Sequence, residues 1–182
     1  METIKGLKRT NYCGELRIED AGKEVTLFGW CQRQRLIFID LRDRTGLVQL
    51  SFNDTTDREV FAKAQSVRAE YVVAAVGTVC ERESKTNKIA TGDIEINVKE
   101  FRIISKAETP PFEIAKSEKV GDETTLKYRY LNLRNEKLTQ NILMRHKIAK
   151  IAREYFYDND FIEIETPMMI KSTPEGARDY VV

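Results

Sequence analysis

Aromatic and polar side chains alternate with apolar ones along several short segments of the chain. Phe38 lies in "LIFIDLRD", Gln49 in "GLVQLSF" and Glu95 in "IEINVKEFRII". Successive side chains of a strand point to opposite faces, so these three residues are expected on the face turned away from the core. An aromatic ring can stack on an unpaired base, and amide and carboxylate groups can hydrogen-bond base edges. The predicted chemistry is recognition of single-stranded nucleic acid.

Arginines lie next to these positions. Arg33 and Arg35 lie at the end of the first predicted strand in "QRQR", and Arg82 lies at the end of the fourth. Guanidinium groups there could hold phosphates. An alternative stays open, because an outward phenylalanine can pack beneath a loop and scattered surface arginines are common; the face would then be inert.

The elements that would position these residues occupy roughly residues 23–104. The expected strands are 23–33, 36–43, 46–52, 71–82 and 94–104, and a helix with Asp57 as its N-cap is expected within 57–70. Three strands, a helix and two more strands is the order of a five-stranded barrel of the oligonucleotide/oligosaccharide-binding type, the OB-fold.

A change of composition follows the predicted barrel. Pro110-Pro111 cannot continue a strand. We therefore expect a barrel domain over 1–108 with an arm at 1–20, a linker or hinge over 109–134, and the start of a second, α+β domain over 135–182. That part begins with a long amphipathic helix over 138–160 and a strand over 161–167 that Pro167 ends.

Composition excludes several classes of protein. Net charge is +1, there is one histidine, and the three cysteines form no C-x-x-C pair. Neither a metal site nor a disulfide framework is indicated, and we expect the cysteines to be small buried side chains in a reducing compartment. No apolar run is long enough to cross a membrane and no secretory signal begins the chain, so a cytoplasmic location is expected.

The sequence resembles one family along nearly its whole length. The motifs that carry the resemblance are "RTNYCGEL", "GKEVTLFGW", "LIFIDLRDRTGLVQL", "TGDIEI", "TPPFEI", "LKYRYLNLR", "FIEIETP" and "KSTPEGARDYVV", in that order. They are similar to the N-terminal part of bacterial-type aspartyl-tRNA synthetases, which are class II aminoacyl-tRNA synthetases. The resemblance implies an OB-fold anticodon-binding domain followed by the beginning of a class II antiparallel-sheet catalytic domain.

The resemblance also implies roles for individual residues. Phe38 would stack on the middle anticodon base and Gln49 would read its edge. The other anticodon-binding residues would be Arg33, Arg35, Arg82 and Glu95. The helix and the segment ending at Pro167 would form the dimer motif. Ser172 and Glu175 would belong to a loop that closes over aspartate, with Glu175 toward its ammonium group.

The implied function is an aspartate–tRNA ligase that forms aspartyl-adenylate with ATP and Mg²⁺ and transfers aspartate to its tRNA. Its partners would be the tRNA for aspartate, L-aspartate and a second copy of the chain. No complete catalytic site and no phosphate-binding glycine loop is present in these 182 residues. We therefore expect the chain alone to be inactive and to bind neither ATP nor Mg²⁺. The alternative is a free-standing OB-fold that binds single strands without catalysis.

One departure from the family pattern concerns the loop between the first two strands. Arg35 is followed directly by Leu36, whereas the family usually has about four more residues here. The resemblance links this loop to discrimination between the tRNAs for aspartate and asparagine.

Overall fold

The computed structural model describes residues 2–53 and 56–168 of the chain. The chain divides into two compact units between Pro111 and Phe112. Each unit is described by itself.

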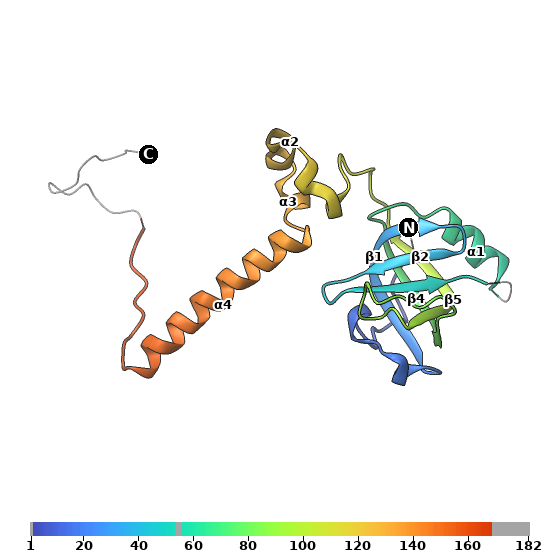
Figure 1. The fold of residues 1–182 in the computed structure, drawn as a ribbon, viewed down its shortest axis with the longest axis horizontal. Coiled ribbons are helices and arrows are strands. Elements are labelled where there is room, and N and C mark those ends of the chain that lie inside the picture. The colour runs from blue at the N-terminus through green and yellow to red at the C-terminus, as the bar shows by residue number, and fades with distance from the viewer. Residues whose placement is uncertain (1, 54–55, 169–182) are drawn as a thin grey trace. The chain divides into compact units, whose positions relative to one another are not determined.

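The first unit is a barrel of five strands with one α-helix (Figure 1). Its elements are β1 (Glu24–Arg35), β2 (Phe38–Arg42), β3 (Leu47–Ser51), α1 (Arg58–Gln65), β4 (Val72–Glu81) and β5 (Ile94–Ser105). Asp57 caps α1, because its side chain accepts hydrogen bonds from the backbone N–H groups of Glu59 and Val60. The predicted order of elements is confirmed.

The strands close into a barrel in the order β1-β2-β3-β5-β4. All neighbours are antiparallel except β3 and β5, which are parallel and pair over three residues. A shift of register between Val76 and Gly77 bends β4 against β5. Gly77 is required there, because a Cβ at this position would lie 2.3 Å from the carbonyl oxygen of Asn97.

The core of the barrel comes from the inward positions of the alternating strands. The fully buried side chains include Leu27, Ile39, Leu41, Leu50, Ile94 and Ile96. Phe52 and Phe101 pack edge to face, with ring centroids 5.3 Å apart. The intervening residues of β2, among them Phe38, are half-buried and lie outside this core.

The residues before β1 are fastened to the barrel by Asp43. One carboxylate oxygen accepts from the backbone N–H of Cys13 at 2.7 Å and from Arg9 Nη1 at 3.3 Å. The other accepts from the backbone N–H and hydroxyl of Thr45, at 2.8 and 2.7 Å. Burial opposes ionisation, but these hydrogen bonds outweigh it and hold the pKa of Asp43 below its ordinary value.

The second unit has short helices followed by one long helix. A 3₁₀ segment (Ile114–Lys119) precedes α2 (Asp122–Lys127), α3 (Arg129–Asn132) and α4 (Glu136–Asp158). Phe112, Ile114 and Leu131 form a small core. Asn135 caps α4 by accepting from the backbone N–H of Lys137, and its amide nitrogen donates to the carbonyl of Ile114 at 3.2 Å. This cap starts the helix two residues earlier than we predicted.

The prediction of a strand over residues 161–167 is wrong. These residues have no regular secondary structure, and Phe161, Ile162 and Ile164 are exposed. An alternating pattern becomes a strand only when another strand satisfies its backbone hydrogen bonds, and the described residues offer this segment no such partner. Within the same residues, no helix has the length and apolarity that crossing a membrane requires.

We expect Asp43→Asn to lower the free energy of unfolding by about 1–3 kcal/mol at pH 7, because an amide cannot accept all the hydrogen bonds that the buried carboxylate accepts. The measurement is urea denaturation. A pKa lower in the folded state stabilises the protein above the unfolded value of about 3.9, and this contribution is lost as pH falls through the folded pKa. The difference in free energy of unfolding between wild type and Asp43→Asn should therefore become smaller at acidic pH. Asp93→Asn, at an exposed position, is the control; an equal loss in both variants would contradict the assignment.

Candidate anticodon-type nucleic-acid interface

A row of five residues crosses all five strands on the outside of the barrel. Arg33 of β1 is paired with Asp40 of β2, Asp40 with Gln49 of β3, Gln49 with Glu95 of β5, and Glu95 with Cys80 of β4. Closure of the barrel thus brings Gln49 and Glu95 together although 46 positions separate them. Three predicted site residues, Arg33, Gln49 and Glu95, belong to this row, which we call the outer row.

Gln49 is held from both sides. Its Nε2 donates to Glu95 Oε2 at 2.8 Å, and its Oε1 accepts from Arg82 Nη2. Only 5% of Gln49 is exposed. Because the carboxylate can only accept and the guanidinium can only donate, the two contacts fix which end of the amide faces which neighbour. The amide keeps one N–H and one lone pair for a further partner.

Phe38 lies two residues before Asp40 on the same face of β2. It is half-buried, opposite Arg35 on one side and Ser51 on the other. The ring is therefore neither in the barrel interior nor in the hydrophobic core. An aromatic ring on the outer face of a strand, next to polar side chains, is of the kind that can stack on an unpaired base.

The two arginines of β1 differ in their contacts. Arg35 Nη2 contacts Asp40 Oδ2 at 2.8 Å, and Arg33 is the cross-strand neighbour of the same Asp40; both arginines are exposed. The six predicted anticodon residues thus lie on or next to one face, and three of them, Arg82, Gln49 and Glu95, are joined by hydrogen bonds. The family resemblance implies no role for Asp40, which lies between Phe38 and Arg42 on the outward face of β2.

The hairpin between β1 and β2 has only two residues, Leu36 and Ile37. The predicted start of the second strand at Leu36 is wrong, because Leu36 and Ile37 are exposed in the turn and β2 begins at Phe38. Leu36 has φ of 37°, a conformation that suits glycine or asparagine and strains a leucine. The strain lies directly beside Arg35 and Phe38.

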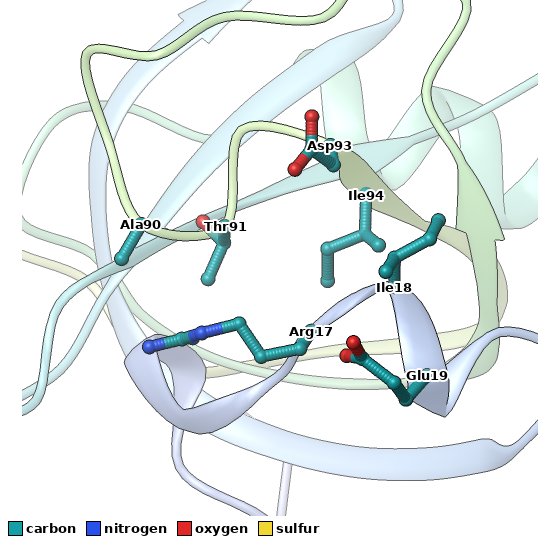
Figure 2. A pocket seen from close by; sticks show the side chains of 7 residues that line it. All are labelled: Arg17, Ile18, Glu19, Ala90, Thr91, Asp93 and Ile94. Carbon is teal, nitrogen blue, oxygen red and sulfur yellow. The ribbon is translucent and has the colours of Figure 1, made fainter.

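A separate hollow of about 180 Å³ lies between the 3₁₀ segment Ile18–Asp20 and the residues before β5. Figure 2 shows Arg17, Ile18 and Glu19 on one side and Ala90, Thr91, Asp93 and Ile94 on the other. The guanidinium of Arg17 donates to the carbonyls of Gly14 and Leu16. The hollow contains none of the predicted site residues, and stacking on a barrel face needs no deep pocket.

The cysteines differ from one another. Cys13 and Cys31 are buried as predicted, and burial, reinforced by Asp40 and Glu70, raises the pKa of the Cys31 thiol to about 12. Cys80 is only half-buried at the end of the outer row, which corrects our expectation. In the described parts of the chain, no three His, Cys, Asp or Glu side chains gather as metal ligands would.

The predicted residues of the second domain are less informative. Pro167 is exposed in the segment without regular structure. Ser172 and Glu175 lie outside the described residues.

Comparison with known proteins covers both units. Residues 24–104 match the family model described as an OB-fold nucleic acid binding domain, and residues 121–182 match class II tRNA synthetases of the D, K and N group. The whole chain is 53% identical, over 187 aligned positions, to an aspartate–tRNA ligase of Ruminiclostridium cellulolyticum. The chain belongs to the class II aspartyl-tRNA synthetase family.

Two further related proteins show which share of a synthetase this chain covers. An aspartate–tRNA(Asp/Asn) ligase of Caldanaerobacter subterraneus subsp. tengcongensis is also 53% identical over the whole chain. The asparaginyl-tRNA synthetase of Pyrococcus horikoshii with asparaginyl-adenylate is 28% identical, with a TM-score of 0.81 over 94% of this chain and 39% of that chain. The chain spans about a third of the length of the bacterial ligases, 31% and 32%.

We expect Leu36→Asn to raise the free energy of unfolding by about 0.5–1 kcal/mol, because asparagine tolerates positive φ and the leucine side chain is 85% exposed. Thermal or urea denaturation measures the change. Ile37→Asn, at the adjacent position without positive φ, is the control and should not stabilise. A lower free energy of unfolding for Leu36→Asn would contradict the claim that the positive φ strains Leu36.

Proposed function

We propose that this chain is the tRNA-recognising N-terminal part of an aspartate–tRNA ligase that works in the cytoplasm. The observation that carries the proposal is the outer face of the barrel. Phe38 lies there beside a fixed Gln49, with Arg82 and Glu95 in contact with that amide. The face lies on a domain whose family model describes nucleic acid binding.

The geometry suggests how an anticodon would be read. The middle base of the aspartate anticodon is uracil, whose edge offers an N–H donor beside a carbonyl acceptor. Gln49 retains one lone pair and one N–H after its contacts with Arg82 and Glu95, which match that edge. Phe38 would stack on the same base, while Arg33 and Arg35 would hold the neighbouring nucleotides and phosphates.

The whole protein would carry out two chemical steps. The carboxylate of aspartate attacks the α-phosphate of ATP, giving aspartyl-adenylate and pyrophosphate, and the terminal adenosine hydroxyl of the tRNA then attacks the activated carbonyl. We assign to this chain recognition of the tRNA and, through Ser172 and Glu175, contact with aspartate. ATP and Mg²⁺ would be bound by the parts of the related ligases that this chain does not match.

We further propose that the ligase is a homodimer, with α4 and Pro167 at the interface. Along α4, the apolar side chains Ile148, Ile151, Tyr155 and Phe156 are all exposed. An apolar stripe of this size on a helix indicates a surface that another protein covers. The match of residues 121–182 to class II synthetases speaks against a free-standing OB-fold module.

The related ligases differ in whether their names include the tRNA for asparagine. The two bacterial ligases that are 53% identical to this chain differ in their names on this point, one being described for tRNA(Asp/Asn). Overall identity therefore does not separate the two specificities.

We expect Phe38→Ala to weaken binding of an aspartate anticodon stem-loop by about 5- to 150-fold, since stacking on one base is worth about 1–3 kcal/mol. Fluorescence anisotropy with the 182-residue chain measures the dissociation constant. Phe28→Ala is the matched control, because Phe28 is also a half-buried residue of the barrel but contacts Arg9 rather than the outer row. Equal affinity of wild type and Phe38→Ala would refute the proposed face.

The chain by itself should show no aspartate-dependent ATP–pyrophosphate exchange, because it spans only about a third of the related ligases. The same residues extended to the full length of those ligases should catalyse it. Exchange is measured with labelled pyrophosphate, with and without aspartate. Activity of the 182 residues alone would overturn this division of labour.

A further inference from the structure

We infer that Asp40 is a positioning residue for the anticodon, which acts by holding the guanidinium of Arg35 against the face that receives the RNA. The inference rests on the proposed function and extends it to a residue that the family resemblance left without a role. The juxtaposition that carries it is a second carboxylate in the outer row: Glu95 is held by Gln49, whereas Asp40 contacts Arg35, a group that would bind a polyanion.

The contacts of Asp40 place it between both arginines of β1. Its Oδ2 lies 2.8 Å from Arg35 Nη2, and Arg33 is its cross-strand neighbour on β1. Gln49 is its neighbour on β3. The Asp40 side chain is 24% exposed and that of Arg35 is 54% exposed. The carboxylate is therefore the better shielded partner, and the long arginine side chain is the one it restrains.

The position of Arg35 makes such a restraint necessary. Arg35 is the last residue of β1 and is followed by the two-residue turn with strained Leu36. An unrestrained arginine has several rotatable bonds, and ordering it on binding costs conformational entropy. The ion pair with Asp40 would order the guanidinium of Arg35, whose backbone is paired with that of Phe38, before RNA arrives.

Electrostatics alone predicts the opposite role for Asp40. A negative charge on a phosphate-binding surface repels RNA, so its removal should strengthen binding of any sequence, most clearly at low salt. If Asp40 positions Arg35, its removal should weaken binding of the matching loop while non-specific binding becomes tighter. The two explanations therefore differ in the sign of the effect.

The experiment compares wild type, Asp40→Asn, Arg35→Ala and the double variant of the 182-residue chain. Each is titrated with the aspartate anticodon stem-loop and with the same stem carrying a scrambled loop. We expect Asp40→Asn to raise the dissociation constant for the aspartate stem-loop by about two- to fivefold, the range that loss of a partly exposed ion pair supports. Binding of the scrambled loop should become equal or tighter.

The double variant tests whether Asp40 acts through Arg35. Once Arg35 has been removed, Asp40→Asn should cause no further loss for the aspartate loop, because contacting residues are not additive. Glu24→Gln is the matched control: it removes an equal charge and an ion pair, that with Lys99 at 2.8 Å, at the other end of β1. It should leave the preference between the loops unchanged. Melting temperatures confirm that each variant is folded.

The outcomes separate the two proposals. The role of Asp40 would be overturned if Asp40→Asn bound both loops more tightly. It would also be overturned if the losses of binding free energy in the two single variants added up in the double variant. Both results would leave the proposed function intact. A wild-type chain that binds both loops equally would overturn the proposed function, and the inference with it.

Discussion

Closure of the barrel between β3 and β5 is the constraint on which the candidate site depends. The two strands are parallel and share only three residue pairs, Gln49 with Glu95, Leu50 with Ile96, and Ser51 with Asn97. The central pair is buried in the core and the outer pairs face away from it. The hydrophobic free energy that drives Leu50 and Ile96 inward therefore also brings Gln49 and Glu95 together outside.

Next to these closing pairs, one backbone position of β4 admits no side chain. Asn97, one member of the closing pairs, approaches Gly77 of β4 so closely that a Cβ would meet its carbonyl oxygen. The register of β4 against β5 shifts at this point. The twist introduced by such a bulge lets β5 serve as neighbour to both β4 and β3.

The polar groups of the outer face satisfy one another in the structure. Gln49 contacts Arg82 and Glu95, and Arg35 contacts Asp40. A buried amide without partners would cost free energy, so these contacts stabilise the free protein. They also leave each group in one orientation, which would reduce the conformational entropy lost in the base binding that we propose.

The sequence by itself determined the barrel, the position of α1 and the face on which Phe38, Gln49 and Glu95 lie, because strand alternation and a capping aspartate are local signals. It could not determine which outward residues touch, since the contact of Gln49 with Glu95 depends on closure between distant strands. It misjudged Ile37, whose alternation was overridden by a two-residue turn, and residues 161–167, whose pattern lacks a strand partner among the described residues. Local patterns specify faces, whereas register and pairing are set by the tertiary structure, because backbone hydrogen bonds between strands need two segments to meet.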